Sequence, residues 1–207
     1  MKGRLITLEG GEGAGKSTAV ETIRSWLEAR GRQVILTREP GGTAAAEQIR
    51  ELLLDPATGE LTPTTELLLM FAARAENLAR VIRPALEAGQ DVICDRFTDA
   101  SMAYQGGGRE LGREPVETLA SMVHPDLKPD LTLLLDIDVA AGLSRIRQRG
   151  SGPDRFEQNR QEFLERVRAS YLDQAGREPE RFVVIDAGGT LNEVQASIEQ
   201  ALLERLA

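Results

Sequence analysis

The sequence has one cysteine, few lysines and no long apolar segment, and each shortage argues against a class of protein. Cys94 is the single cysteine among 207 residues, so an intramolecular disulfide is impossible and a reducing cytoplasm is expected. No apolar run approaches the roughly 18 residues that a membrane-spanning helix needs. Met1 leads directly into a predicted strand. We therefore expect neither secretion nor membrane insertion.

The chain also lacks a surplus of positive charge. Lysine and arginine number 25 against 33 acidic residues, which gives a net charge of −8. A surface that binds duplex nucleic acid needs a positive patch, so nucleic acid is not an expected partner. Only Lys2, Lys16 and Lys128 are lysines. Arginine therefore carries nearly all the positive charge, which suits phosphate binding, although high-GC codon usage produces the same bias.

Apolar runs alternate with helix-length segments along the whole chain. This alternation predicts an α/β fold in which a parallel five-stranded sheet is flanked by helices on both faces and binds ligands at the carboxyl ends of its strands. Because we find no repeat and no linker, residues 1–207 are expected to form a single domain. The predicted strands lie near 5–9, 33–36, 91–94, 131–135 and 182–185, and the predicted helices near 16–30, 43–54, 64–88, 97–104, 115–123, 139–148, 157–175 and 190–206.

The most specific motif is a glycine-rich run that fits G-x-x-x-x-G-K-[ST], the phosphate-binding loop (P-loop). It joins a predicted strand to a helix, where inward backbone N–H groups and the helix N-terminus attract phosphate. We expect the lysine to contact the β- and γ-phosphates of a nucleotide and the serine hydroxyl to bind Mg²⁺. The run consists of Gly10, Gly11, Glu12, Gly13, Ala14, Gly15, Lys16, Ser17 and Thr18.

An acidic residue at the tip of a central strand is the expected partner of such a loop, because it can support the metal ion. Two residues compete for this role: Asp95 follows the apolar run at 92–94, and Asp136 follows the run at 133–135. We favour Asp95, because the adjacent Arg96 could hold a second phosphate.

Three other features have both a structural and a functional interpretation. The polar segment 37–43 either only turns the chain or contacts a ligand. Arg74 is the one cation beside the apolar stretch 67–73, and it either reaches solvent or points into a pocket. The glycine triplet 106–108 permits a mobile or a closely packed loop.

A basic segment at about 147–157 contains a Gly-Ser-Gly-Pro hinge between two predicted helices. An exposed turn with charges at helix ends explains most clusters of this kind. Beside a P-loop we favour a lid, which would close over a triphosphate and bring an arginine to the transferred phosphoryl group. The candidate arginines are Arg147, Arg149 and Arg155.

Together these segments resemble the thymidylate kinase family, from the first strand to about residue 190. The P-loop alone indicates only a nucleoside triphosphate site, whereas Asp95-Arg96 followed by Ala103-Tyr104-Gln105 and three glycines is far more selective. The resemblance implies a P-loop kinase fold, transfer of the γ-phosphoryl of ATP to dTMP with Mg²⁺, and a homodimer. Further matching pieces are Leu8-Glu9-Gly10, the segment 38–43, Ala73-Arg74 and Phe97.

The resemblance also implies roles for individual residues. Arg96 would bind the phosphate of the acceptor, helped by Arg38 or Arg50. Arg74 and Gln105 would read the thymine edge, while Tyr104 would crowd the 2′ position of the sugar. The implied substrate-binding residues are Glu12, Arg38, Glu39, Arg50, Phe71, Arg74, Arg96, Ser101, Tyr104 and Gln105.

Two positions depart from the pattern of many members. Some members carry an arginine directly after the acidic P-loop residue, where this chain has Gly13. Members without it resemble this chain in having a basic lid, so the catalytic arginine is expected among Arg147, Arg149 and Arg155. The thymine-stacking phenylalanine often lies four residues before the helix arginine, where this chain has Met70; Phe71 lies three before it. Either residue could face the base.

Two other functions compete with this interpretation. Another P-loop nucleoside or nucleotide kinase would share most of the site, and a substrate panel would separate the two. A P-loop assembly ATPase fits the loop alone but does not explain Arg74, Asp95-Arg96 and the basic segment as a set. A GTPase switch is disfavoured, because no lysine follows an asparagine and the N-K-x-D guanine motif is missing.

Overall fold

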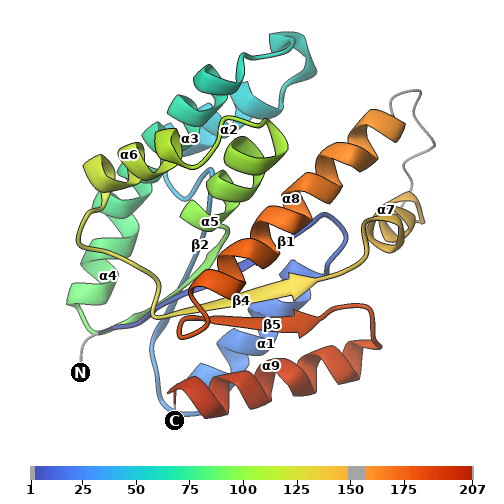
Figure 1. Cartoon of the computed structure of the whole chain (residues 1–207). Helices are drawn as coiled ribbons and strands as arrows, with labels where there is room; N and C mark the ends of the chain where they lie inside the picture. Colours follow the sequence, from blue (N-terminus) through green and yellow to red (C-terminus); the bar gives the residue numbers. More distant parts are fainter. Residues whose placement is uncertain (1–2, 149–156, 207) are drawn as a thin grey trace.

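The computed structural model describes residues 3–148 and 157–206, which build one twisted parallel sheet with helices on both faces (Figure 1). The strand order is β2-β3-β1-β4-β5, and every neighbouring pair is parallel. This arrangement confirms the predicted sheet. The strands are β1 (Leu5–Gly10), β2 (Val34–Arg38), β3 (Asp91–Asp95), β4 (Leu131–Asp136) and β5 (Phe182–Asp186).

Helices connect the strands and cover the two faces of the sheet. On one face α1 and α9 lie side by side, and the other helices pack above the opposite face and beyond its carboxyl edge (Figure 1). The helical elements are α1 (Lys16–Glu28), α2 (Ala44–Leu54), the 3₁₀ turn η1 (Pro56–Thr58), α3 (Pro63–Asn77), the π-helical turn η2 (Leu78–Ile82), α4 (Arg83–Glu87), α5 (Thr98–Ser101), the π-helical turn η3 (Met102–Gly108), α6 (Glu114–Val123), α7 (Val139–Arg147), α8 (Glu157–Arg177) and α9 (Leu191–Leu206).

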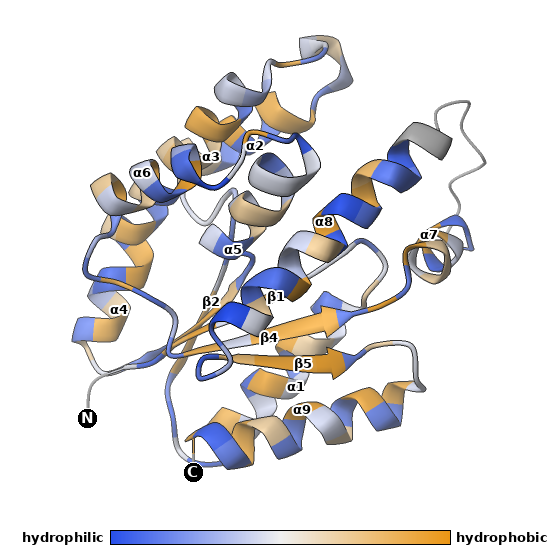
Figure 2. Ribbon diagram, in the orientation of Figure 1, coloured by the Kyte–Doolittle hydropathy of each residue, from blue (hydrophilic) through white to orange (hydrophobic). Residues whose placement is uncertain are grey.

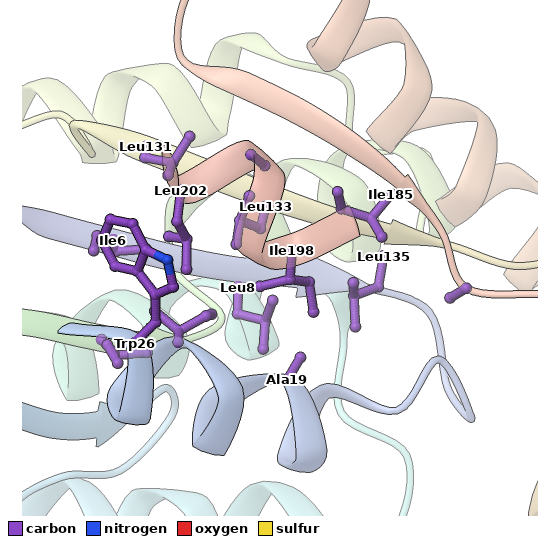
Figure 3. Close-up of a cluster of buried hydrophobic side chains, with 14 of the residues drawn as sticks. Ile6, Leu8, Ala19, Trp26, Leu131, Leu133, Leu135, Ile185, Ile198 and Leu202 are labelled. Carbon is purple, nitrogen blue, oxygen red and sulfur yellow. The ribbon is translucent and has the colours of Figure 1, made fainter. Parts of the chain in front are cut away.

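The hydrophobic core lies on both sides of the sheet, because successive residues of a strand point to opposite faces. In β1, Ile6 and Leu8 pack toward α1 and α9, whereas Leu5 packs toward η2 and α4. Figure 3 shows the first of these clusters, in which Trp26 and Ile198 approach the strands from the two helices.

The outer faces of the helices are largely hydrophilic, in contrast to the apolar strands (Figure 2). No helix in the described part of the chain combines the length and the apolar content that crossing a membrane requires.

Two predicted helices differ from the observed ones at their ends or interior. The segment predicted as one helix at 64–88 contains the π-helical turn η2 between α3 and α4. The helix predicted at 97–104 continues through η3 to Gly108, so the glycine triplet is helical and the predicted loop at 106–108 was wrong. The triplet is closely packed, because a side chain at Gly107 would overlap Ser170 and one at Gly108 would overlap Phe163 of α8.

We predict that Ile198→Ala destabilises the protein by about 2–5 kcal/mol, because it leaves a cavity in the core between α9 and the sheet. Ile198 is fully buried, whereas Leu203 of the same helix is 49% exposed and provides the control. Leu203→Ala should change the free energy of unfolding by less than about 0.5 kcal/mol. Urea unfolding of the three proteins measures both values, and equal losses for the two variants would contradict this assignment of the core.

Candidate active site

A cavity of about 430 Å³ opens where β1, β2 and β3 end. Ligands of parallel α/β sheets bind at this edge, since the loops after the strands converge there. The lining residues come from the P-loop, the ends of β2 and β3, and helices α2, α3, α5 and α8, with η3. They are Glu12, Glu39, Pro40, Arg50, Leu53, Leu54, Glu66, Met70, Arg74, Arg96, Phe97, Ala100, Ser101, Tyr104, Gln105, Arg109 and Phe163.

The P-loop lies beside this cavity and joins β1 to α1. Gly13 and Gly15 have φ angles of 74° and 89°, which side chains rarely adopt, and Gly15 precedes the first residue of α1. The ammonium group of Lys16 donates to the carbonyl oxygens of Gly10 (3.1 Å) and Gly11 (3.0 Å), so it already lies within the loop. Burial lowers the pKa of Lys16 to about 8.

The surroundings of Gly13 leave no space for an arginine, or any other side chain, at that position of the P-loop. A Cβ atom at Gly13 would overlap the carbonyl oxygen of Gly142 in α7, and one at Gly142 would overlap the carbonyl oxygen of Glu12. The backbones of the P-loop and α7 are therefore in direct contact. A side chain at position 13 would have to push α7 away and adopt a positive φ angle.

Arg74 points into the protein toward the cavity, as the pocket interpretation of this residue requires. Its Nε donates to Glu39 (2.6 Å), and one terminal nitrogen donates to the Phe97 carbonyl and the Ser101 hydroxyl (3.0 Å each). The other terminal nitrogen, Nη1, is buried and has no hydrogen-bond partner in the described structure. Because Arg74 lines the cavity, this unpaired donor is the kind of group that awaits a ligand acceptor.

Glu39, which accepts from Arg74, is itself held in place by a further hydrogen bond. Its second oxygen accepts a hydrogen bond from the Asn77 side chain at 3.3 Å, and Asn77 also accepts from Thr37. Burial raises the pKa of Glu39, although the charge and hydrogen bond of Arg74 oppose the rise. A buried pair of this kind is costly to break, by about 3–5 kcal/mol when one partner is removed.

Gln105 is fixed by a second acidic residue, Glu66 of α3. The Gln105 amide nitrogen donates to Glu66 at 2.6 Å, and Arg109 donates to the other Glu66 oxygen at 3.0 Å. Because a carboxylate only accepts, the Gln105 amide must turn its nitrogen toward Glu66. Its carbonyl oxygen is then the end that remains to accept a hydrogen bond from a ligand in the cavity.

The structure distinguishes Met70 from Phe71. Met70 lines the cavity, whereas Phe71 is buried behind it and packs with Leu67, Met102 and Val116. The Phe71 ring lies 4.4 Å from the guanidinium carbon of Arg74. The sequence left both residues open and included Phe71 among the implied substrate-binding residues; the structure brings Met70 to the cavity and not Phe71, because one residue along α3 turns the side chain by about 100°.

Arg96 directly follows β3 and lies in the wall of the cavity. It donates to the hydroxyl oxygens of Tyr104 (3.0 Å) and Tyr171 (3.2 Å). Tyr171 in turn donates to Glu9 at 2.8 Å, and the second Glu9 oxygen accepts from the Phe97 N–H at 2.7 Å. This cluster places a positive charge between the P-loop strand and the cavity.

The two aspartates that compete for the metal have different surroundings. Both oxygens of Asp136 accept from the guanidinium of Arg168, at 2.7 and 2.9 Å. One oxygen of Asp95 is buried without a hydrogen-bond partner in the described structure. The unpaired oxygen at Asp95 and the Ser17 hydroxyl at the start of α1 are hard oxygen donors that suit Mg²⁺. Among the described residues no cluster of three acidic, histidine or cysteine side chains could hold a metal ion alone.

Arg38 and Arg50 differ in their access to the cavity. Arg50 lines it and donates to the Pro40 carbonyl at 3.0 Å, whereas Arg38 is more than half exposed and pairs with Glu47 at 2.8 Å. Of the two candidate helpers for a phosphate, the structure thus brings Arg50 to the site.

The basic segment lies only partly within the described residues. Arg147 ends α7, while Arg149 and Arg155 lie outside the described residues. Arg160 of α8, which the sequence analysis did not select, forms an ion pair with Glu12 of the P-loop.

Several functional neighbours were missed because their partners are far away in the sequence. Tyr171 and Glu9 are separated by 162 residues, and Gln105 and Glu66 by 39. The one available signal was an acidic residue inside an apolar strand, at Glu9, where a buried carboxylate needs a partner.

Comparisons with known proteins agree on one family. A family model described as thymidylate kinase matches residues 8–198. The thymidylate kinase of Chromohalobacter salexigens is 60% identical over 206 residues, covering 99% of this chain and 97% of the relative. That of Pseudomonas syringae pv. tomato is 55% identical and covers 100% and 98%. The crystal structure of thymidylate kinase from Ehrlichia chaffeensis superposes with a TM-score of 0.80 at 33% identity, covering 98% and 99% of the two chains.

The buried carboxylate of Glu9 generates a prediction about pH. Burial raises the pKa of Glu9 to about 8 from 4.5, Asp99 adds to the rise, and Arg96 and Tyr171 oppose it. Between these pH values the folded protein holds a proton that the unfolded chain has lost, so stability falls as pH rises. The expected slope from this residue is about −1.4 kcal/mol per pH unit.

Glu9→Gln removes the titrating group and should flatten this slope. The measurement is the free energy of unfolding in urea for both proteins at pH 5, 6, 7 and 8. The wild type should lose stability relative to the variant as the pH rises through this interval. A difference between the two proteins that stays constant with pH would show that the Glu9 pKa is not raised.

Proposed function

Because this chain belongs to the thymidylate kinase family, we propose that the cavity at the ends of β1, β2 and β3 is its dTMP site and that the P-loop is its ATP site. The chain is a nucleoside monophosphate kinase, which transfers the γ-phosphoryl group of ATP to dTMP and yields dTDP and ADP. The observation that supports the site assignment is that Arg74, which lines this cavity with Gln105, has a buried Nη1 without a hydrogen-bond partner in the described structure.

These two residues present a pattern of hydrogen-bonding groups that matches thymine. Arg74 offers a donor, which suits the carbonyl oxygen at position 4 of the base. Gln105 offers an acceptor, which suits the N–H at position 3. Cytosine carries an amino group at position 4 and an unprotonated nitrogen at position 3, so both contacts would be lost. A site built for hydrogen bonds rejects a ligand that lacks them strongly.

The phosphates of the two substrates would meet between the P-loop and Arg96. Lys16 and the loop N–H groups hold the donor phosphates, and Arg96, with Arg50 near it, holds the acceptor phosphate. Phosphoryl transfer needs little covalent help from the protein, so positioning and positive charge supply most of the catalysis. Tyr104, which lines the cavity and whose hydroxyl accepts from Arg96, would crowd the 2′ position of the sugar.

We also propose that Ser17 and Asp95 hold Mg²⁺ together with the nucleotide. The buried, unpaired oxygen of Asp95 supports this assignment, and the ionic pairing of Asp136 argues against the alternative. The ion would supply positive charge to the phosphate oxygens when bound. Magnesium usually takes one or two protein oxygens besides water and substrate phosphates.

The substrate prediction is a preference for dTMP over dCMP, dGMP and the ribose form of TMP. For dCMP and dGMP, loss of the Arg74 and Gln105 contacts should lower kcat/KM by about 10²-fold or more. The ribose form has the same base, so its lower kcat/KM should come from crowding of the 2′-hydroxyl by Tyr104. A coupled assay with ATP and each monophosphate measures the ratios. Lys16→Ala is the control, since it should abolish turnover while far-UV circular dichroism stays unchanged. Equal kcat/KM values for dTMP and dCMP would contradict the proposed base site.

A second prediction concerns the source of the catalytic arginine, which we propose lies in the basic segment at about 147–157. The contact between Gly13 and Gly142 excludes a side chain at position 13 of the P-loop. The same contact places α7, the helix that leads into the basic segment, directly against the P-loop. Loss of an arginine that meets the transferring phosphoryl group costs about 10³-fold in kcat. We expect a loss of this size in at least one of Arg147→Ala, Arg149→Ala and Arg155→Ala, with Arg149 the first candidate and Arg155 the second.

Steady-state kinetics of these variants should show a small change in the KM for dTMP. Arg177→Ala provides a matched control, because Arg177 lies at the far end of α8 and is 59% exposed beside Asp173. Its kcat should stay within about twofold of the wild type. If all three segment variants keep kcat within tenfold, the catalytic arginine lies elsewhere.

A third prediction is a homodimer through α3. Leu68, Ala72 and Ala75 are exposed at helical spacing on this helix, and Leu68 is 52% exposed. An apolar stripe on a helix surface is suited to packing against a second copy. Sedimentation at micromolar concentration should give a dimer for the wild type and a monomer for Ala72→Glu. A monomeric wild type would contradict the proposal.

Two general properties complete the proposal. We propose that the chain acts as one kinase domain over residues 1–207, supported by the single sheet that the described residues share. A cytoplasmic location is supported by Cys94, a buried cysteine that forms no disulfide.

A further inference from the structure

The backbone of Arg96 is held in an uncommon conformation. Its φ angle is 70°, in the left-handed region that residues other than glycine rarely adopt. The Arg96 N–H donates to the Leu8 carbonyl at 3.0 Å, and the Cys94 thiol donates to the Arg96 carbonyl at 3.0 Å. An unusual backbone conformation that the surroundings enforce is a frequent feature of functional sites. The backbone alone, however, does not determine where a long arginine side chain points.

A chain of hydrogen bonds determines the direction of the side chain. Nη1 of Arg96 lies 3.2 Å from the Tyr171 hydroxyl oxygen, and this oxygen lies 2.8 Å from Oε2 of Glu9. A guanidinium only donates, so the tyrosine oxygen must accept from Arg96 and send its own proton to Glu9. Arg96 therefore donates to Tyr171, and Tyr171 donates to Glu9.

Tyr171 does not contact a ligand in the 430 Å³ cavity directly. Its side chain is 1% exposed in the middle of α8. Tyr104, which accepts from the other end of the guanidinium, lines the 430 Å³ cavity, and Tyr171 is not among the residues that line it. Any effect of the Tyr171 hydroxyl on a ligand in this cavity must therefore pass through Arg96 or Glu9.

We propose that Tyr171 is a positioning residue that keeps Arg96 directed at the 5′-phosphate of the acceptor. The hydroxyl lies between the half-buried guanidinium of Arg96 and the buried carboxyl group of Glu9, and it is bonded to both. Without it, Nη1 loses its acceptor and Glu9 loses a donor, so the guanidinium turns toward Glu9 and away from the cavity. This inference rests on the proposed function, in which Arg96 binds the phosphate of dTMP.

The test compares the binding of dTMP with that of thymidine, which has the same base and sugar but no phosphate. Calorimetric titration without ATP gives both dissociation constants, and their ratio isolates the contribution of the phosphate. Tyr171→Phe keeps the buried ring and removes the hydroxyl. We expect dTMP to bind about tenfold more weakly to this variant, in the range of a lost hydrogen bond to a charged group. The dissociation constant of thymidine for this variant should stay within about twofold of the wild-type value.

Three variants make the comparison specific. Ser170→Ala removes a hydroxyl from the adjacent residue of α8. The Ser170 hydroxyl donates to the Met102 carbonyl and not to Arg96, so the ratio of the thymidine and dTMP dissociation constants should not change. Arg96→Ala should abolish most of the preference for dTMP. Glu9→Gln should reduce it as Tyr171→Phe does, because an amide has one acceptor oxygen for the two donors that Glu9 satisfies.

The outcomes separate this inference from the proposed function. If Arg96→Ala removes the preference and Tyr171→Phe retains it while still binding thymidine, Tyr171 does not position Arg96, and the dTMP site stands. If Arg96→Ala itself keeps the wild-type preference, the phosphate is bound elsewhere, and the proposed role of Arg96 is wrong. Should Tyr171→Phe fail to bind thymidine, the ratio in Glu9→Gln decides: a reduced preference supports the inference, and an unchanged preference overturns it.

Discussion

The acceptor side of this site depends on one constraint: a guanidinium that turns inward needs an acidic residue that is buried and fixed in place. Arg74 has Glu39, which follows β2, and Arg96 has Glu9, which lies near the end of β1 and is reached through Tyr171. Desolvation of an unpaired charge would cost several kcal/mol, so these pairs cannot be separated without loss. Because the strands place the carboxylates, the sheet also determines where the two arginines can present their remaining N–H groups.

The donor side is governed by close contact between backbones. Gly13 and Gly142 bring the P-loop and α7 so near that neither position has space for a side chain. This contact holds α7 directly against the P-loop, whose one cation is Lys16. Positive charge for a transferring phosphoryl group must then come from outside the loop, which is why the basic segment after α7 is important to the proposed mechanism.

The sequence was sufficient for the features that local rules determine. The five strands and the P-loop with its helix follow from periodicity and glycine chemistry. The sequence left open whether Arg74 reaches solvent or points into a pocket. It was not sufficient where packing between distant segments decides. The helical glycine triplet depends on α8 approaching Gly107 and Gly108, and the choice of Met70 over Phe71 depends on which face of α3 meets α6. Tyr171, Glu66 and Arg160 were missed for the same reason, since their partners lie on other elements.

The central claim is that one cavity holds dTMP and the adjoining P-loop holds ATP, with their phosphates in line. A single molecule that joins adenosine and thymidine through a chain of phosphates tests this claim most directly. In calorimetric titration it should bind one molecule per chain, and saturating ATP or saturating dTMP should each weaken its binding. Lys16→Ala and Arg96→Ala should each weaken its binding, since both cations are proposed to contact the phosphate chain. Competition by only one of the two nucleotides would contradict the account, because the two sites would then not adjoin.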